Sequence, residues 1–391
     1  MPHASRDAQS ADRPATGLPG AALLRVAALL ALLYVFLFAI ALLGTAFKAF
    51  GGGFSEALIT GTTNPVVGLL IGLLATAVVQ SSSGTTSIIV GMVAADALTV
   101  RGAIPIIMGA NMGTTITNTI VAMGAMGRRA EFRRAFAGAT MHDFFNLLTI
   151  LLLFPLEMGT HYLESAATWI SMHLVGAQGV EFEGPVKAIT EPPAAALRDL
   201  LIGGWHMHGT AAAVLLLAIS LAVLFGSLIL LAGLMRRVVM PRAEGAFNEY
   251  LQRSGVLCIL LGLVVTVLVQ SSSITTSLLV PLIGAGIVQL EPAFAVTLGA
   301  NIGTTVTALL ASMTGNGAAV TVALVHLLFN LTGTLIFYPV PALRRIPIRL
   351  ARLLALASCR NRMVALYYVL GVFFAMPLLF IVISKALGGS R

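Results

Sequence analysis

Two identical polar motifs are the residues of this chain best suited to chemistry. Gln80-Ser81-Ser82-Ser83 recurs as Gln270-Ser271-Ser272-Ser273, and each copy lies inside a strongly apolar stretch. Seryl hydroxyls can donate hydrogen bonds to the oxygens of an oxyanion, and glutamine can offer either a carbonyl oxygen or an amide. The motifs contain no lysine, arginine or metal-ligand cluster. An anion bound there would need mobile cations to balance its charge.

A second pair of motifs supplies oxygen atoms suited to such cations. The run Gly-Ala-Asn-Met-Gly-Thr-Thr at 109–115 recurs as Gly-Ala-Asn-Ile-Gly-Thr-Thr at 299–305. Amide and hydroxyl oxygens are hard ligands of the kind that an alkali ion takes, and the candidates are Asn111, Thr114, Thr115, Asn301, Thr304 and Thr305. Cation-coupled transport of an anion is the simplest hypothesis that uses both pairs of motifs.

A single carboxylate, Asp143, lies in the apolar run 136–156. A charge inside a membrane span is unfavourable and usually functional. Its counterpart in the second copy is Leu327, so the acid belongs to one copy only, which predicts a cation site in the first copy. The alternative is that Asp143 pairs only with water or with the nearby Arg133 and Arg134.

The paired motifs belong to a long internal repeat. Both recur at one shift, the first from position 80 to 270 and the second from 109 to 299. His142-x-x-Phe-Asn146 recurs as His326-x-x-Phe-Asn330 at a shift shorter by six residues, and chance does not explain three such matches. Each His shares a helix face with the Asn four positions on, so we expect these residues to form packing hydrogen bonds and not to ligate a metal.

Composition indicates a membrane protein. Of 391 residues, 58% are hydrophobic and only 10% are charged, whereas soluble domains carry about 25% charged residues. This excludes a water-soluble enzyme, a secreted disulfide scaffold and a nucleic-acid binder. The net charge of +8 fits the excess of arginine in cytoplasmic loops. The two cysteines, Cys258 and Cys359, are far apart and are expected to be inert.

The polar motifs need elements that hold them inside the membrane. A straight helix over 64–98 would be about 50 Å long, against a bilayer core of about 30 Å. A broken helix must be buried in protein or face a water-filled cavity, and a re-entrant hairpin with residues 80–86 near its tip meets both demands. We therefore expect an all-α polytopic membrane protein with two inverted-topology repeats, each with a re-entrant hairpin carrying a Gln-Ser-Ser-Ser tip and an unwound transmembrane helix.

The expected organisation follows from these spans and from the arginine clusters. It comprises a disordered cytoplasmic N-terminus at 1–20, transmembrane repeat 1 at 21–157, an extracytoplasmic loop at 158–205, transmembrane repeat 2 at 206–341, and an amphipathic segment with a final transmembrane helix at 342–391. Residues 346–358 are expected to form an amphipathic helix on the inner surface. No cleaved signal peptide is expected before the first span. The side of the C-terminus is left open.

Together the residues resemble a known family. The paired motifs, with the run Glu-Phe-Arg-Arg-Ala-Phe-Ala-Gly-Ala-Thr-Met-His-Asp-Phe-Phe-Asn at 131–146, closely resemble the type II sodium-dependent phosphate cotransporter family. The resemblance covers residues from about 21 to 384. It implies sodium-driven import of inorganic phosphate by alternating access. The arginine pattern predicts a cytoplasmic N-terminus. Residues 158–205 contain no Asn and no Cys, unlike the glycosylated, disulfide-bonded loop of vertebrate relatives, so a bacterial inner membrane is expected. The partners implied are phosphate, sodium and the lipid bilayer, with no nucleic acid and no cofactor beyond sodium as co-substrate; a homo-oligomer is left open.

The motifs and the resemblance together define the expected site. Phosphate is expected at Ser81, Ser82, Ser83, Ser271, Ser272, Ser273, Gln80, Gln270, Asn111 and Asn301. Sodium is expected at Asp143, Asn146, Thr114, Thr115, Thr304, Thr305, Thr307, Gln80 and Gln270. In the family an Asp at this position marks electrogenic members, so by resemblance Asp143 helps to bind an extra sodium ion. The chain has Ala125, Arg128 and Ala300 where many members have Gln, Asp and Ser, which leaves the geometry of one sodium site open.

The motifs admit four other interpretations. Buried serines can serve only to hydrogen-bond neighbouring helices. A serine hydrolase using Ser82 or Ser272 would need a lysine or histidine base nearby, and neither motif has one. We therefore expect no enzyme. A passive anion channel, or a sodium-coupled transporter of another oxyanion, would share the same helix-end chemistry.

Overall fold

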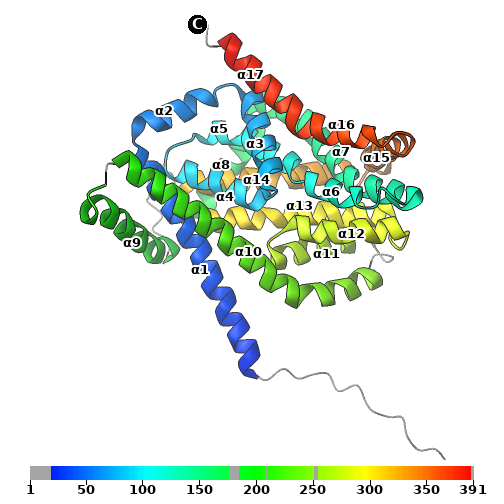
Figure 1. The fold of residues 1–391 in the computed structure, drawn as a ribbon, viewed down its shortest axis with the longest axis horizontal. Coiled ribbons are helices and arrows are strands. Elements are labelled where there is room, and N and C mark those ends of the chain that lie inside the picture. Colours follow the sequence, from blue (N-terminus) through cyan, green and yellow to red (C-terminus); the bar gives the residue numbers. More distant parts are fainter. Residues whose placement is uncertain (1–18, 176–184, 208, 251–253, 389–391) are drawn as a thin grey trace, which may run out of the picture.

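The computed structural model describes residues 19–175, 185–207, 209–250 and 254–388, and in these ranges the chain is built of helices without strands (Figure 1). The predicted all-α class is confirmed. The disorder predicted for residues 1–20 concerns a segment that lies outside the described residues except for its last two positions.

The first half of the chain runs from α1 into the segment that follows the first copy of the repeat. Its helices are α1 (Pro19–Phe50), α2 (Gly52–Gly61), α3 (Pro65–Val79), α4 (Ser82–Ala94), α5 (Val100–Gly113), α6 (Ile116–Met123), α7 (Arg129–Thr160), α8 (Tyr162–Val175), α9 (Pro185–Asp199) and a π-helical turn at Leu200–Gly204.

The second half contains the second copy of the motifs and the C-terminal segment. Its helices are α10 (Gly209–Tyr250), α11 (Gly255–Val269), α12 (Ser272–Ala285), α13 (Leu290–Ser312), α14 (Gly317–Phe337), α15 (Pro341–Arg360), α16 (Met363–Leu370), a π-helical turn at Gly371–Ala375, and α17 (Met376–Gly388).

Several of these helices are suited to crossing a bilayer. In the described ranges, six are long and apolar enough, namely Leu23–Phe50, Arg129–Thr160, Gly209–Pro241, Leu290–Ser312, Gly317–Phe337 and Met363–Ala386. A seventh is counted if α2 and α3, which meet at an angle of 102°, form one broken span. The helices α4, α11 and α12 are apolar but shorter than these spans. The fold is therefore that of a polytopic membrane protein.

The internal repeat is visible in the helix boundaries. The helix pair α3 and α4 recurs as α11 and α12. In both pairs the break consists of the Gln and the first Ser of the Gln-Ser-Ser-Ser motif. In each copy the helix before the break packs along the helix that carries the Gly-Ala-Asn motif, α3 on α5 and α11 on α13. The long helices α1 and α10 lie side by side (Figure 1).

The expectation of an unwound helix in each repeat is wrong for the second copy. In the first copy only a short interruption at Thr114 and Thr115 separates α5 from α6, and both residues keep right-handed helical angles. In the second copy α13 runs unbroken through the motif. The glycines serve close packing instead: a Cβ on Gly109 would lie 1.8 Å from Leu69 O, and one on Gly299 would lie 1.8 Å from Ile259 O.

The predicted amphipathic segment 346–358 lies within α15, which is a single helix. Its buried residues recur at intervals of three and four positions, Pro347, Ile348, Ala351, Ala355 and Ser358. Arg345, Arg349, Arg352 and Arg360 are exposed, whereas Arg344 is half-buried and its guanidinium lies over the Tyr338 ring. The helix packs along α7, and Figure 1 shows α15 followed by α16 and α17 at one edge of the molecule.

Candidate functional site

Each Gln-Ser-Ser-Ser motif forms a helix break with the same backbone geometry. Gln80 follows α3 with φ 55° and ψ 27°, and Gln270 follows α11 with φ 57° and ψ 25°. This left-handed region is unfavourable for a non-glycine residue by about 1–2 kcal/mol. Such strain persists where surrounding contacts hold it, and it concentrates at functional sites. Its presence at two matched positions makes these breaks the leading candidate for a functional site.

The first serine of each motif begins the next helix. Ser81 Oγ accepts a hydrogen bond from Gly84 N at 3.1 Å, and Ser271 Oγ accepts one from Ile274 N at 3.4 Å. These serines are therefore N-caps. An N-cap satisfies only one of the free N–H groups of the first turn. The other N–H groups, with the positive end of the helix dipole, are left for a ligand at each break.

The two breaks are in direct contact although they are far apart in the sequence. Ser83 Oγ donates to the Gln270 backbone carbonyl at 3.4 Å. Thr307 of α13 donates to Gln270 Oε1 at 2.9 Å and lies 3.5 Å from Ser83 Oγ. The structure therefore brings together the serine motifs and one of the threonines predicted from the sequence.

A cavity of about 430 Å³ lies where the breaks meet. All eight residues of the two motifs line it, residues 80–83 from one side and 270–273 from the other. Sites for small molecules commonly measure about 300–1,000 Å³, so a small oxyanion fits here. Ser82, Ser83 and Ser272 are buried, which places three hydroxyls inside the protein at the cavity wall.

One face of α10 closes the cavity and adds a residue that the sequence analysis missed. The lining residues from α10 are Phe225, Leu228, Ile229, Ala232, Gly233 and Arg236, spaced as on a single helix face. Arg236 has no ion-pair partner among the described residues. A guanidinium can bind an oxyanion through two parallel hydrogen bonds. The sequence shows only that Arg236 shares a helix face with Gly233. The tertiary structure is needed to show that this face of α10 meets the serine motifs.

Asn301 takes part in a buried hydrogen-bond network next to this site. His142 Nε2 donates to Asn301 Oδ1 at 2.7 Å, and Asn301 Nδ2 donates to Asn146 Oδ1 at 2.9 Å. Asn301 was predicted as a phosphate ligand, but it does not line the cavity and its amide is used by α7. The expectation that His142 forms a packing hydrogen bond is confirmed.

Asn111 occupies the matching position in the other copy. Asn330 Nδ2 and His326 Nε2 both donate to Asn111 Oδ1, at 3.1 and 3.3 Å. Asn146 Nδ2 donates to the Asn111 carbonyl at 2.8 Å and so joins the two halves of the network. Asn111 likewise does not line the cavity. The network connects α5, α7, α13 and α14 by hydrogen bonds.

Asp143 forms a separate polar cluster. It is fully buried in α7, and its Oδ2 accepts hydrogen bonds from Tyr368 at 2.8 Å and from Thr119 at 3.5 Å. Its Oδ1 has no hydrogen-bond partner in the described part of the chain. Nothing in the repeat pointed to Tyr368, because that residue belongs to the C-terminal segment outside both copies.

The part of the alternative interpretation in which Asp143 pairs with Arg133 or Arg134 is contradicted by the structure. In the ranges that the structure describes, neither Arg133 nor Arg134 pairs with it. Arg134 Nε instead donates to the Gly284 carbonyl at 2.7 Å. A buried carboxylate oxygen without a positive side chain nearby is available to a cation.

Most of the threonines predicted as sodium ligands form hydrogen bonds within their own helices. Thr114 and Thr304 donate to the carbonyl four residues earlier, and Thr115 and Thr305 to the one three residues earlier. Their hydroxyl protons are therefore engaged within their own helices, although each oxygen keeps acceptor capacity. Of the threonines predicted as ligands, Thr307 alone hydrogen-bonds to the serine motifs among the described residues.

The positions where the chain departs from the family pattern do not form a compensating site. Arg128 is exposed and pairs with Glu131 at 2.8 Å at the start of α7. Ala300 is fully buried in α13 and offers no side-chain oxygen. The predicted ligand Asn146 uses its amide for the asparagine network.

Comparison with known proteins gives a consistent result. A family model described as Na+/Pi-cotransporter matches residues 35–177 and 222–355. The sodium-dependent phosphate transport protein 2B of Homo sapiens is 36% identical over 444 residues, covering 90% of this chain and 64% of the relative. The sodium-dependent phosphate transport protein 2A of Rattus norvegicus is 35% identical over 438 residues, covering 94% of this chain and 69% of the relative. The chain thus spans just under two thirds of the 2B relative's length, and no solved structure matches it.

Proposed function

The chain belongs to the Na+/Pi-cotransporter family, and from this premise we propose that it imports inorganic phosphate together with sodium ions by alternating access. The serine-lined cavity between the two helix breaks is the proposed phosphate site. The observation that carries this proposal is the contact between two matched breaks, one from each copy of the repeat, around a single cavity.

The cavity has the charge that a phosphate ion requires. The first turns of α4 and α12 line it, and each helix N-terminus is equivalent to roughly half a positive charge. Arg236 adds a full positive charge at the wall. Serine hydroxyls supply donors without further charge. The sum of about +2 matches the charge of a phosphate dianion, so the role of sodium ions bound beside it is to couple transport to the sodium gradient.

Two sodium positions follow from the polar clusters. The first lies at Gln270 and Thr307, where an amide oxygen and a hydroxyl meet beside the cavity. The second lies at Asp143, whose Oδ1 lacks a partner in the described residues. A sodium ion at Asp143 makes the cycle electrogenic when phosphate is carried as the monoanion, because two sodium ions then accompany one negative charge.

The proposed mechanism needs a particular topology. We propose that α3–α4 and α11–α12 are re-entrant hairpins in two inverted repeats, that the N-terminus is cytoplasmic, and that the protein resides in the inner membrane of a bacterium. The asparagine network supports alternating access, because it fixes α5, α7, α13 and α14 as one unit against which other helices can move. The arginine clusters at the start of α7, in α10 and in α15 support this orientation if they face the cytoplasm, where arginine is in excess.

The proposal is tested by phosphate uptake into proteoliposomes. Radiolabelled phosphate is followed under inward gradients of sodium, lithium, potassium or protons. We expect saturable accumulation against the phosphate gradient with sodium only. Passive equilibration without sodium dependence would indicate a channel, and stronger uptake of sulfate than of phosphate would indicate a transporter of another oxyanion; either result would refute the proposal.

A further inference from the structure

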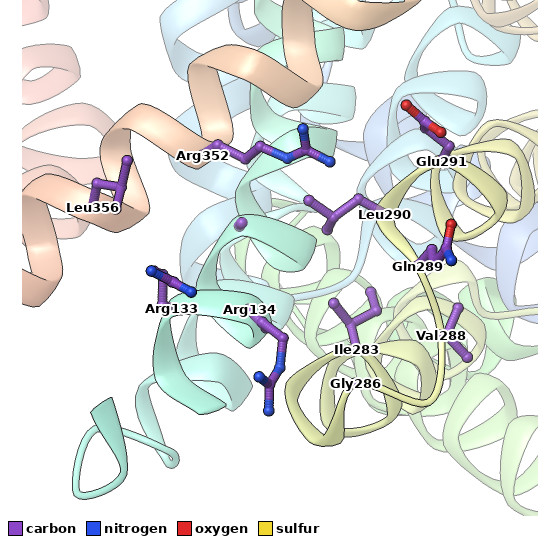
Figure 2. Close-up of a pocket in the computed structure, with 11 residues that line it drawn as sticks. Arg133, Arg134, Ile283, Gly286, Val288, Gln289, Leu290, Glu291, Arg352 and Leu356 are labelled. Atoms are coloured by element: carbon purple, nitrogen blue, oxygen red, sulfur yellow. The ribbon is translucent and has the colours of Figure 1, made fainter. Parts of the chain in front are cut away.

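A second cavity lies on the arginine-rich side of the fold, away from the serine motifs. It measures about 440 Å³ and lies between the start of α7, the turn from α12 to α13, and α15. Figure 2 shows Arg352 extending from α15 toward the start of α13, where Leu290 and Glu291 lie. An adjoining cavity of about 360 Å³ continues along the same face and shares Arg133 and Leu356 with the first.

The charge in these two cavities is strongly positive. Their charged lining residues are Arg129, Arg133, Arg134, Arg352, Arg360 and one acid, Glu291. Arg134 is used by the protein itself, since its Nε donates to the Gly284 carbonyl and its guanidinium covers the turn at Gly286. In the described part of the chain, Arg133 and Arg352 form no ion pair, with Glu291 or with any other acid. Two guanidiniums are thus left for an external anion.

The surroundings of these arginines are apolar and open. Leu356 lines both cavities and is 43% exposed, and Leu353 on the same helix is 62% exposed. Ile283, Val288 and Leu290 form the opposite wall (Figure 2). A free anion would gain nothing from exposed leucines. An amphiphile with an anionic head and apolar chains matches both features, because α15 presents guanidiniums and leucines together, as an interfacial amphipathic helix does.

We propose that this paired cavity binds the headgroup of an anionic phospholipid. The phosphodiester lies between Arg133 and Arg352, which approach it from two different helices, and the acyl chains lie along Leu353 and Leu356. Basic pockets between membrane helices on the cytoplasmic side suit such headgroups. The bound lipid would join α7 to α15 and so hold the amphipathic helix against the bundle. This site does not depend on the proposed transport function.

Native mass spectrometry of the full chain in detergent tests the proposal. The probe is an equimolar mixture of dioleoylphosphatidylglycerol and dioleoylphosphatidylcholine. The wild-type protein is expected to retain the phosphatidylglycerol preferentially. The double variant Arg133→Gln/Arg352→Gln is expected to bind it about tenfold more weakly, because each arginine beside an anionic lipid contributes to affinity. The matched control, Arg345→Gln/Arg349→Gln, removes the same charge from exposed positions outside both cavities and is expected to stay within about twofold of wild type.

The outcomes distinguish the lipid from a free anion and from general surface charge. Undiminished phosphatidylglycerol binding in the double variant would overturn the proposal, and so would an equal loss in the control. Excess inorganic phosphate is added as a competitor; complete displacement of the lipid would show that the arginines bind free phosphate and would also overturn it. Arg352→Gln alone, an exposed substitution on α15, provides a second variant if the double variant does not fold.

Discussion

Replacing Gln270 with glycine separates the backbone role of this residue from its side-chain role. Glycine relieves the left-handed conformation, φ 57° and ψ 25°, which disfavours glutamine by about 1–2 kcal/mol. Against this, glycine loses roughly 0.5–1 kcal/mol more conformational entropy on folding. The variant also loses two side-chain hydrogen bonds, the one from Thr307 at 2.9 Å and the one that Gln270 Nε2 donates to the Val267 carbonyl at 2.6 Å, each a contribution of about 0.5–1.5 kcal/mol. The losses somewhat exceed the relief of strain, so the free energy of unfolding should fall by about 1 kcal/mol.

Transport should respond very differently from stability. Gln270→Gly removes the amide oxygen proposed to bind sodium beside the cavity, so sodium-dependent phosphate uptake should fall to background. The two quantities are measured on one preparation, stability from thermal unfolding in detergent and uptake from proteoliposomes. A change of about 1 kcal/mol in the free energy of unfolding shifts Tm by no more than about 2–4 °C, because the shift becomes smaller as the chain becomes longer.

Gln80→Gly is the matched stability control. Gln80 has nearly the same backbone angles, and its side chain makes no hydrogen bond within the described residues. This variant therefore gains the relief of strain without losing a contact and should be the more stable of the two.

Wild-type uptake and sodium dependence in Gln270→Gly would refute the side-chain role. Destabilisation of that variant by more than about 3 kcal/mol would refute this energy balance.

Three further perturbations test other parts of the structure. Asp143→Gly should abolish net charge movement while leaving phosphate uptake measurable, and unchanged voltage sensitivity in potential-driven vesicles would count against a sodium ion at that carboxylate. Arg236→Gln should raise the half-saturating phosphate concentration about tenfold, since a charged hydrogen bond contributes about 1.5–3 kcal/mol; Arg237→Gln, which does not line the cavity, should not. Gly109→Ala places a Cβ 1.8 Å from Leu69 O and should destabilise the protein by about 1–3 kcal/mol or more, whereas Gly226→Ala, with open space around it, should be neutral in thermal unfolding.

The sequence was sufficient to locate the helix breaks. Serines inside an apolar run are good N-caps for a new helix, and this is a local property. Duplication of the motif then predicted that the two breaks would meet. The structure places Ser83 against Gln270. The same local reasoning failed at the Gly-Ala-Asn motifs. There, glycine has two uses, unwinding a helix or admitting a neighbour's backbone, and the Cβ distances at Gly299 show the second.

Residues that act from outside the repeat could not be found from local pattern. Arg236 stood among arginines that report membrane orientation, and only the packing of α10 against both motifs places it at the cavity. Tyr368 reaches Asp143 from a helix 225 positions further along the chain. Asn111 and Asn301 were correctly identified as a matched pair, but their partners lie on α7 and α14 and were set by tertiary contacts.

The central claim is that the two Gln-Ser-Ser-Ser breaks form one phosphate site, and Ser82→Ala and Ser272→Ala test it most directly. Both serines are buried at the cavity wall, and Ser227→Ala, a buried serine of α10 that does not line the cavity, is the control. Sodium-driven uptake of radiolabelled phosphate should be lost in each of the first two variants, with the protein still inserted and monodisperse, and retained in the control. Full uptake by both Ser82→Ala and Ser272→Ala would contradict the account.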